Sequence, residues 1–420
     1  MEPPREWIDA DTGHRVTRLS DEPDSSSLYF NYNCFTPQGD LLILETPTGI
    51  SRVNTKTRAL EQVIAIPETF RLLFTGHSSR LAYYSVQPDR GQRGGPKSIH
   101  AVDVDTGVSR LIAEVSGGDI QTINADETLL GGVQALPHPL TATLQISKPR
   151  DPKLDQVAFS ASWPDGRPMT YADAKEVALN ERLEAGIPMK MFVIDTRTGE
   201  RRDIYGSTDW LNHLLFSPTD PNVLMFCHEG PWHKVDRLWL LRLDQPGSSP
   251  VKIHTRMMNM EIAGHEWFSH DGKTIWYDLQ TPRGEDFWVA GYEIATGMRT
   301  WYHLERDEWS VHFNSSPDGR LFAGDGGDEE MVAHAKDAKW IYLFTPHGVP
   351  DVAGIKANDA DSLVTPGYFT SHKLVNMKDH DYRLEPNIMF TPDGKSIVFR
   401  SNMHGPVHVY VVLLDKEGRA

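Results

Sequence analysis

The chain has 420 residues, of which 39% are hydrophobic and 24% charged, and its formal net charge is −16. This composition is typical of a soluble globular protein, and no apolar run of about 18 residues is present to span a membrane. The acidic surplus argues against nucleic-acid binding, because no excess of basic residues is available to displace counterions from a polyanion. We therefore expect neither nucleic acid nor a membrane among its partners.

Cysteine usage and the N-terminal segment bear on the compartment. Cys34 and Cys227 are too few for a disulfide framework, and both lie in apolar, strand-like surroundings, so we expect buried free thiols. The N-terminal segment MEPPREWIDADTG is polar and has no apolar signal core. The chain is therefore predicted to be cytoplasmic, or periplasmic if a signal peptide has been removed.

One short pattern recurs seven times along the chain: an aromatic or apolar residue, a turn of the Pro-Asp-Gly kind, and then an apolar strand. In chain order the copies are FTPQGDLLIL from Phe35, FTGHSSRLAYY from Phe74, INADETLLGGV from Ile123, FSPTDPNVLMF from Phe216, FSHDGKTIWY from Phe268, SSPDGRLFAG from Ser315 and FTPDGKSIVF from Phe390. Asp-Gly supplies the positive-φ positions of a tight hairpin, and the flanking apolar runs are the strands that it joins. Repeated at this spacing, the pattern predicts an all-β, seven-bladed β-propeller.

A second turn, of the Asp-Thr-Gly kind, follows most copies and predicts the outer hairpin of each blade. Examples are VDVDTGVSRLI from Val102, VIDTRTGERRDI from Val193 and YEIATGMRTWY from Tyr292. The N-terminal DTGHRVTRLS resembles these hairpins. Because a propeller closes when one end of the chain completes the last blade, we expect this segment to supply a strand there.

Two steps between copies are longer than a blade and predict insertions into a single domain over residues 1–420. The first covers about 145–190, and its middle, TYADAKEVALNERLEAG from Thr170, is rich in helix formers. We expect a short helical insertion over one face of the propeller. The second covers about 333–381 and is polar and irregular. Insertions on one face of a repeat protein commonly build its binding site.

Polar residues gather beside the same strand in several predicted blades, in FCHEGPWHKVDRLWLL, GHEWFSHDG, VHFNSSPDG and HDYRLEPNIMFTPDG. A strand buried on both faces has no place for His or Arg unless these groups meet a partner or a ligand. Since all blades share one axis, we expect these residues to converge at one end of the central channel. The alternative is that they make structural hydrogen bonds only.

Known metal and nucleotide motifs are missing from the sequence, among them HExxH, CxxC, the EF-hand loop, the P-loop and the dinucleotide fingerprint. The G-x-S-x-G elbow of hydrolases is missing too. His312, Glu385 and Asn387 could nevertheless bind a divalent ion through nitrogen and oxygen. Glu385 and Asn387 are two residues apart, so they face one side of an extended strand.

These segments resemble one known family, the oligogalacturonate lyases. The pieces that carry the resemblance run in order from about residue 10 to 415: YFNYNCFTPQGDLLIL, the helical segment leading into MFVIDTRTGE, FCHEGPWHKVDRLWLL, GHEWFSHDG, VHFNSSPDGRLFAGDG and EPNIMFTPDGKSIVF. CHEGP with a following Asp-Arg pair, and then HE before an aromatic residue, is the specific part, whereas SPDG repeats occur in many propellers. The resemblance implies a seven-bladed propeller lyase that cleaves short 4-linked uronate chains by β-elimination, an activity of pectin degradation and carbohydrate metabolism.

The resemblance also implies roles for individual residues. Arg237 falls on the family's catalytic arginine, and His265 falls on its proposed catalytic base. His228 falls on the CHEGP histidine near the substrate, and His312 falls on one metal-binding histidine.

The chain departs from the family at the remaining metal ligands. The family has a His-Pro-His motif preceded by a Gln, whereas this chain has Glu385-Pro386-Asn387 preceded by Tyr382. A divalent metal could bind through His312, Glu385 and Asn387; the family implies manganese, and calcium and zinc stay open. Alternatively the metal is lost, and Tyr382 or Arg383 takes over its role.

Elimination removes the C5 proton beside the uronate carboxylate and expels the O4 oxygen, so the site needs a base and a group that stabilises negative charge. We expect His265 to take the proton, and Arg237, with a metal or Arg383, to hold the carboxylate. His228 or Tyr382 is expected to contact the leaving oxygen. Arg150, in the first insertion, is either a second carboxylate clamp or a solvated surface residue.

Three alternatives remain at this stage. One is a lyase for another uronate, such as a glucuronate-containing oligosaccharide. The second is a non-catalytic, sugar-binding propeller. The third is a propeller hydrolase, such as a glycosidase or a lactonase; a glycosidase would need two facing carboxylates, for which Glu229, Glu266 and Glu385 are available. In each case the expected partner is an acidic oligosaccharide, and the protein is expected to be a monomer or a homodimer.

Overall fold

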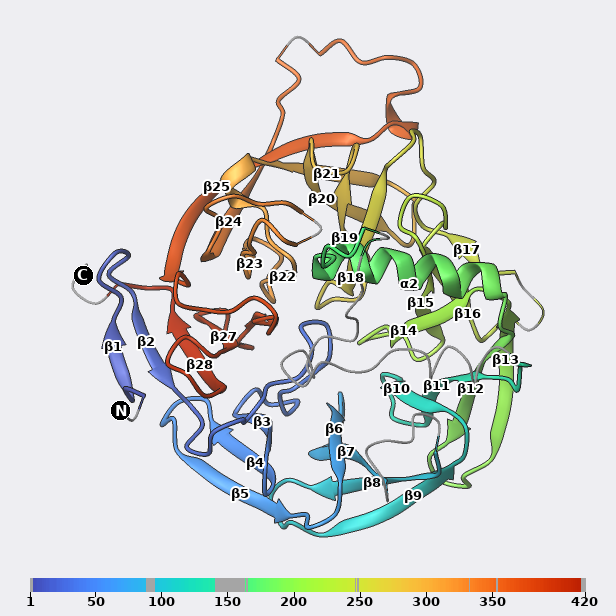
Figure 1. Cartoon of the computed structure of the whole chain (residues 1–420), viewed down its shortest axis with the longest axis vertical. Coiled ribbons are helices and arrows are strands. Elements are labelled where there is room, and N and C mark those ends of the chain that lie inside the picture. Colours follow the sequence, from blue (N-terminus) through green and yellow to red (C-terminus); the bar gives the residue numbers. More distant parts are fainter. Residues whose placement is uncertain are drawn as a thin grey trace.

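The computed structural model describes residues 3–87, 95–139, 163, 165–245, 247, 249–331, 333–352 and 354–416, and it shows a ring of sheets around a central axis (Figure 1). The first blade contains β3 (Leu41–Thr46), β4 (Gly49–Asn54) and β5 (Leu60–Ala65). The second contains β6 (Phe70–Thr75), β7 (Leu81–Val86), β8 (Lys97–Asp103) and β9 (Ser109–Val115). The third contains β10 (Asp119–Ile123), β11 (Leu129–Ala135), β12 (Met189–Asp195) and β13 (Arg201–Ser207). Blades four and five contain β14 (Trp210–Phe216), β15 (Val223–Glu229), β16 (Leu238–Arg242) and β17 (Val251–Lys252), and then β18 (Ile262–Phe268), β19 (Thr274–Gln280), β20 (Phe287–Glu293) and β21 (Arg299–Leu304). Blades six and seven contain β22 (Phe313–Ser315), β23 (Phe322–Gly324), β24 (Trp340–Gly348) and β25 (Thr365–Asn376), and then β26 (Met389–Phe390), β27 (Ser396–Ser401) and β28 (His408–Leu413) with β2 (Arg15–Arg18) and β1 (Glu6–Ile8).

Antiparallel pairing within each blade follows the predicted hairpins, and the predicted seven-bladed propeller is confirmed. Blades five and six are joined into one sheet by parallel pairing of β21 with β25. In the three-stranded first blade, Phe35 bridges Leu42 where an innermost strand would lie. Short 3-10 helices, η2 (Arg306–Glu308) and η3 (Ala360–Ser362), lie in connections.

The N-terminal segment closes the ring. β2 pairs with β28, with Val16 opposite Val412, and β1 adds a further strand outside it. Trp7 of β1 packs edge-on against Tyr410 of β28. The predicted completion of the last blade by DTGHRVTRLS is therefore confirmed, and the two ends of the chain lie together at the rim (Figure 1).

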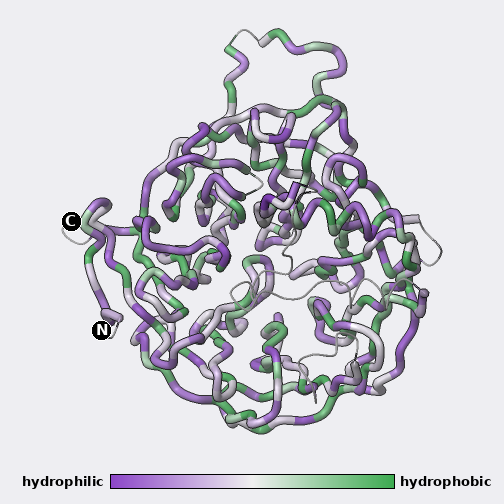
Figure 2. Tube along the Cα trace, in the orientation of Figure 1, coloured by the Kyte–Doolittle hydropathy of each residue, from purple (hydrophilic) through white to green (hydrophobic). Residues whose placement is uncertain are grey.

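The inner and middle strands of the blades are buried on both faces, for example β15 and β28, because each blade packs between two neighbours. Figure 2 shows hydrophobic residues within the ring of blades and hydrophilic residues along much of its rim. The inner hairpins share one turn geometry: Gly39, Gly272, Gly319 and Gly394 have φ angles of 68°, 69°, 69° and 68°. These four glycines belong to four copies of the repeated pattern. The left-handed conformation, which favours glycine, explains why glycine recurs at this point of the repeat.

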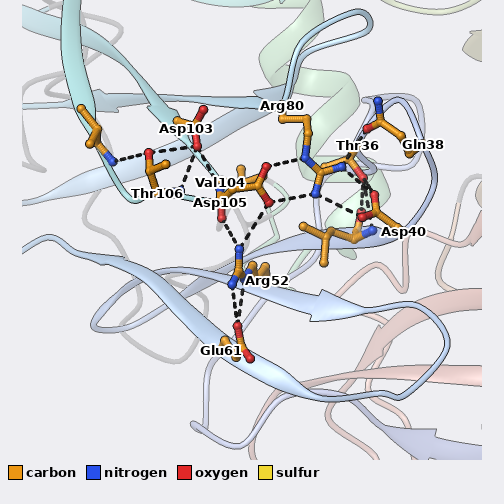
Figure 3. A network of polar contacts seen from close by, with 12 residues as sticks. Thr36, Gln38, Asp40, Arg52, Glu61, Arg80, Asp103, Val104, Asp105 and Thr106 are labelled. Atoms are coloured by element: carbon orange, nitrogen blue, oxygen red, sulfur yellow. Dashed lines mark hydrogen bonds and ion pairs between the residues drawn. The ribbon is translucent and has the colours of Figure 1, made fainter.

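The carboxylates of the repeated turns connect neighbouring blades. Arg80 of the second blade bonds Asp40 of the first blade at 2.7 Å and Asp105 of its own outer turn at 2.5 Å (Figure 3). Arg52 bonds Glu61 and the backbone oxygen of Val104 in the same network. The hydrogen bonds from Arg80 lower the pKa of Asp40 to about 2. Because these side chains are partly exposed, the network fixes the orientation of the blades more than it adds stability.

The first predicted insertion contains helix α2 (Tyr171–Ala185), as expected. Thr170 caps its start by accepting a hydrogen bond from the backbone N–H of Asp173, and Gly186 ends it in the left-handed conformation. Figure 1 shows α2 lying across one face of the ring, from near its centre to the rim. Among the described residues, no helix is both long and apolar enough to cross a membrane. Arg150 lies outside the described residues.

The second predicted insertion, 333–381, is not irregular. It contains β24 and β25, which pair over most of their length as the outer strands of the sixth blade. Of the described residues in this segment, 349–352 and 354–364 project away from the ring at its rim (Figure 1). The alternating exposed and buried residues of β25 explain the misleading polar composition, because an outermost strand faces solvent on one side.

We predict that Val16→Ala lowers the free energy of unfolding by about 2 kcal/mol, because it removes two fully buried methyl groups from the strand that closes the ring. Urea unfolding of both proteins measures the difference. The matched control is Val108→Ala on an exposed turn, which should change stability by less than about 0.5 kcal/mol. Equal effects of the two substitutions would contradict the role given to β2.

Candidate active site

One position of the repeat places polar side chains in the central channel. His213, His265, His312 and Asn387 each stand three residues before the aromatic or serine residue that opens the turn motif of their blade. The pairing of β14 and of β18 is interrupted by a register shift at this point. His213, His265 and Asn387 have φ angles of 49°, 39° and 53°, which non-glycine residues rarely adopt. These irregularities occur where four consecutive blades turn a polar residue toward the axis. We refer to these four residues and the charged groups around them as the polar cluster.

The segment that precedes the first blade forms the floor of this polar cluster. Tyr29 lies between blades, with its ring 5.1 Å from His312 and 6.0 Å from His213. Phe30 stacks on His312 at 4.7 Å. The side chain of Asn31 donates to the backbone oxygen of Glu266, which attaches the segment to the fifth blade. The histidines of different blades are thus in contact with one shared aromatic surface.

His265 is held in the orientation of a general base. Its Nδ1 lies 3.1 Å from Oδ1 of Asp278, on the neighbouring strand β19. A carboxylate at this distance accepts the Nδ1 proton and leaves Nε2 as the basic nitrogen. The ring is partly exposed and stands 4.7 Å from the ring of His312. Nε2 of His265 makes no hydrogen bond within the described part of the chain, so it can accept a proton inside the polar cluster.

Arg237 is fixed by Glu266, the residue that follows His265 in the chain. Nε of Arg237 donates to Oε2 of Glu266 at 3.1 Å, while the thiol of Cys227 donates to Oε1 at 2.7 Å, so both oxygens of the carboxylate are occupied. Within the described residues, the terminal amino groups of Arg237 have no hydrogen-bond partner, and they are not fully enclosed. The planar end of the guanidinium is thus available for a second carboxylate.

Burial and the neighbouring cation act in opposite directions on Glu266. Burial raises its pKa, but Arg237 and His213 outweigh this and lower the pKa to about 2. Burial also raises the pKa of the Cys227 thiol, which stays protonated and donates its hydrogen bond. Cys34 and Cys227 are both buried and free, as predicted. Glu266 is therefore a permanent anion whose function is to position Arg237.

His312 and Asn387 bond one buried carboxylate, that of Asp325, and Glu385 lies on the other side of the His312 ring. Asp325 accepts from Nδ1 of His312 at 2.8 Å and from the backbone N–H of Asn387 at 3.3 Å. Nε2 of His312 lies 3.1 Å from the Tyr29 hydroxyl and 3.8 Å from Oε2 of Glu385. Burial opposes protonation of His312, but Asp325 and Glu385 outweigh it and raise the pKa of this imidazole.

This arrangement fits a divalent cation in one specific respect. Oδ1 of Asn387 is buried and meets no hydrogen-bond donor among the residues that the structure describes, which is costly for an amide oxygen unless a ligand meets it. An imidazole oriented by a carboxylate, a second carboxylate and an amide oxygen form a mixed nitrogen and oxygen donor set. Among the described residues, no cluster of three or more His, Cys, Asp or Glu side chains could hold a metal. The site would depend on the amide of Asn387.

Two further cations reach the cluster. Arg400 of β27 donates from Nε to the backbone oxygen of Glu385 at 2.8 Å and from NH1 to Ser26 at 2.8 Å. Lys175, on helix α2, contributes to lowering the pKa of Glu229 and Glu385, where burial alone would raise it. The channel therefore combines several carboxylates with cations from the blades and from the insertion.

Three residues predicted to bind substrate are placed elsewhere. His228 points away from Arg237, toward Asp209 at 2.7 Å and the ring of Trp239 at 5.2 Å. Tyr382 is buried in the core, and its hydroxyl donates to the backbone oxygen of Asp325. Arg383 is exposed and bonds Asp381. Substrate contact by Tyr382 or Arg383 does not fit these positions, and the same holds for their predicted replacement of a metal.

The structure adds His213, Tyr29 and Asp278, which sequence reasoning missed, and it shows where the predicted candidate Glu229 lies. His213 has the same offset from the repeated turn as His265, and this offset was the signal that could have identified it. Glu229, next to His228, points to the channel side, where it accepts from Asn212 at 2.7 Å and lies 4.0 Å from His213. Tyr29 and Asp278 had no local signal, because their partners are distant in the chain.

A separate cavity of about 150 Å³ lies toward the other end of the channel. It is lined by residues of the repeated turns, among them Phe35, Phe216, His270 and Phe390. Neither His265 nor Arg237 lines it, and Phe30 and Trp267 stand between it and the polar cluster. We therefore place the candidate active site at the polar cluster, where charged side chains meet, and not at this cavity.

The protein is a seven-bladed propeller. Its channel holds a histidine oriented by a carboxylate and an arginine whose terminal amino groups make no hydrogen bond among the described residues. A family model described as oligogalacturonate lyase matches residues 172–417, which contain the whole polar cluster except Tyr29 and Phe30. This match covers more than half of the chain, so the chain belongs to the oligogalacturonate lyase family. The resemblance seen in the sequence is confirmed.

Individual relatives support the same family. An oligogalacturonide lyase of Pectobacterium atrosepticum is 27% identical over 237 residues, and an oligogalacturonate lyase of Dickeya dadantii is 27% identical over 233 residues. Each match covers 53% of this chain and 54% of the relative, so the chain spans about half the length of the curated relatives it matches.

Solved structures show the same fold over almost the whole chain. An oligogalacturonate lyase in complex with manganese has a TM-score of 0.71 at 23% identity, covering 98% of this chain and 96% of that chain. An oligogalacturonate lyase of Vibrio parahaemolyticus has a TM-score of 0.70 at 21% identity, covering 99% and 97%.

The buried pair of Glu266 and Arg237 leads to a prediction on acid stability. Because the pKa of Glu266 is lowered from 4.5 to about 2, its stabilising contribution is fully present above pH 4.5 and is lost as the pH falls toward 2. Glu266→Gln should cost about 3–5 kcal/mol at neutral pH, where Arg237 is left without its partner. Urea unfolding at several pH values should show the curves of parent and variant converging between pH 4.5 and 2. Glu200→Gln, on an exposed turn, is the control, and parallel curves for Glu266→Gln would contradict the assignment.

Proposed function

We propose that this chain is a carbon-oxygen lyase that cleaves 4-linked uronic-acid oligosaccharides of the oligogalacturonate type by β-elimination, giving unsaturated uronates. The observation that carries the proposal is the pair of His265, oriented by Asp278, and Arg237, whose free guanidinium end lies in the same cluster. Base and carboxylate binder are the two groups that elimination beside a carboxylate requires. Family membership supports the same reaction.

Arg237 would bind the carboxylate of the uronate whose C5 proton is removed. Its Nε is occupied by Glu266, so its two terminal amino groups face the substrate as a fork that matches both carboxylate oxygens. Glu266 keeps the guanidinium in place and, as an anion on the far side, does not compete for these amino groups. As negative charge develops on the uronate carboxylate, the already positioned cation stabilises it without reorganisation.

His265 would take the C5 proton on Nε2. The electron pair of the C5–H bond forms the C4–C5 double bond, the C4–O4 bond breaks, and the departing O4 oxygen takes up a proton from water. Asp278 stabilises the resulting imidazolium through Nδ1. The base is regenerated when it releases the proton to solvent, so the reaction needs no co-reactant.

We propose that His312, Glu385 and Asn387 hold a divalent cation. One solved relative of the same fold is a complex with manganese. When bound, such an ion would supply positive charge that neutralises the uronate carboxylate. The unpartnered Oδ1 of Asn387 supports this ligand set, and manganese is preferred over calcium because His312 contributes a nitrogen ligand.

The other functions considered receive less support. A glycosidase would need a carboxyl group that can donate a proton, but Glu266 is held ionised by Arg237 and both of its oxygens are engaged. A purely sugar-binding propeller would not require an oriented histidine base. A lyase for glucuronate-containing oligosaccharides shares every step above and differs only in the sugar. Cytoplasmic location and a monomeric or homodimeric state stay predictions.

We predict that His265→Asn reduces elimination of oligogalacturonate by about 100- to 10,000-fold, because the general base is lost. The ultraviolet absorbance of the unsaturated product measures the rate. His303→Asn, on an outer strand of the same blade, is the matched control and should keep the parent's activity. If His265→Asn folds and retains most of its activity, His265 is not the base.

Asn387 allows a test of the proposed cation site. Asn387→Gly keeps the left-handed backbone, since glycine adopts φ near 53° without strain, and removes only the amide. We expect it to weaken manganese binding by at least about tenfold, measured by paramagnetic resonance titration of the protein without substrate. Asn402→Gly, on a nearby loop, is the control. Equal affinity in parent and Asn387→Gly would exclude Asn387 as a ligand.

A further inference from the structure

Several residues on one side of helix α2 contact the face of the propeller. Glu176 forms an ion pair with Arg283 of the fifth blade. Asn180 accepts from Lys234 at 2.7 Å, and Arg182 stacks over Trp210. Leu179 is buried against Trp232 and Ile262. The helix therefore has a fixed position above blades four and five.

Lys175 lies on this same side of the helix, four residues before Leu179, but it is not tied in the same way. Among the described residues, no carboxylate lies within ion-pair distance of its ammonium group, which stands 5.5 Å from the centre of the Trp232 ring. The side chain is only partly exposed. A partly buried ammonium without an anionic partner has an unused capacity to bind one.

The charge of Lys175 acts on groups from blades on different sides of the channel. It favours the ionised forms of Glu229, in the fourth blade, and of Glu385, in the seventh. It also disfavours protonation of His213, whose pKa is lowered mainly by burial. Trp232, whose ring the ammonium approaches, follows Glu229 by three residues, and Glu229 lies 4.0 Å from His213, so the ammonium lies near the polar cluster rather than at the rim. Figure 1 shows one end of α2 close to the centre of the ring, in agreement with this position.

We propose that Lys175 is a specificity-determining residue that binds the carboxylate of a second uronate, next to the one held by Arg237. A uronate oligosaccharide carries one carboxylate on each sugar, so a chain that leaves the channel on the side of the helix presents its next carboxylate there. Arg237 is held down in the blade by Glu266, whereas Lys175 approaches from the insertion. The inference rests on the proposed function, since it names the second charge of the same substrate.

Lys175→Met tests the proposal, because methionine keeps much of the apolar stem and removes the charge. We expect KM for trigalacturonate to rise about tenfold with kcat changed less than about twofold, as for loss of one partly screened ion pair. Trigalacturonate that is methyl-esterified on the sugars other than the reacting one should show no difference between parent and variant. Lys234→Met is the control, because Lys234 holds the same helix through Asn180 and has no place in the channel.

Binding without turnover separates this inference from the proposed function. Calorimetric titration of trigalacturonate into His265→Asn, with and without Lys175→Met, measures the affinity alone. If the parent protein shows no elimination but Lys175→Met still weakens binding of the charged trisaccharide alone, the reaction fails and the role of Lys175 stands.

Three outcomes of the titration would overturn the role of Lys175. Equal binding with and without the lysine would falsify the inference directly. Equal losses for charged and esterified ligands would show that Lys175 acts on the structure of the site instead of on a second carboxylate. Failure of the parent to bind either ligand would remove the substrate class on which the inference rests.

Discussion

The polar cluster depends on one constraint, the pairing of β2 with β28 that closes the ring. A closed ring makes the innermost strands share one axis, so residues at one offset of the repeat come to the same level of the channel. In blades four to seven that offset carries three histidines and Asn387, whereas in blades one to three it carries Tyr32, Arg71 and Ile120. At this offset the histidines and the asparagine are therefore confined to one half of the ring. The family match from residue 172 onward covers this same half.

Several features inside this half of the ring lower local stability. Arg237 and Glu266 are buried together, and a buried ion pair contributes little net free energy compared with apolar packing. His265 and Asn387 adopt backbone conformations that are strained for side-chain-bearing residues. Elsewhere the blades follow the ordinary rules of alternation, tight glycine turns and apolar cores. Unfavourable local features such as these are concentrated in one place, whereas the rest of the fold is consistent. Such a concentration marks a functional site.

The sequence alone was sufficient for the features that depend on local chemistry. The repeated turns predicted seven blades, DTGH predicted the closing strand, and the start of helix α2 after Thr170 could be read from its composition. Side-chain direction could not be predicted. His228 and Glu229 are neighbours in β15 and face opposite sides of the strand. An error of one residue in the assumed register therefore exchanges the side chain that faces the channel with the one that faces the blade interior. The positions of Tyr382 and Arg383 depend on a loop held by His380, which bonds Ser401 and the backbone of Leu384. Such contacts between distant segments leave no periodic pattern.

Charge balance connects the altered ligand motif with the inserted helix. Glu385 adds a negative charge to the channel, and by itself this charge would repel the acidic substrate that we propose. His312 stands at 3.8 Å from Glu385, Arg400 bonds its backbone, and Lys175 lies above it. His312 and Arg400 belong to the blades and Lys175 to the insertion, so groups from both parts of the molecule face this carboxylate. The proposed binding of an acidic oligosaccharide would therefore depend on the ring and the helix together.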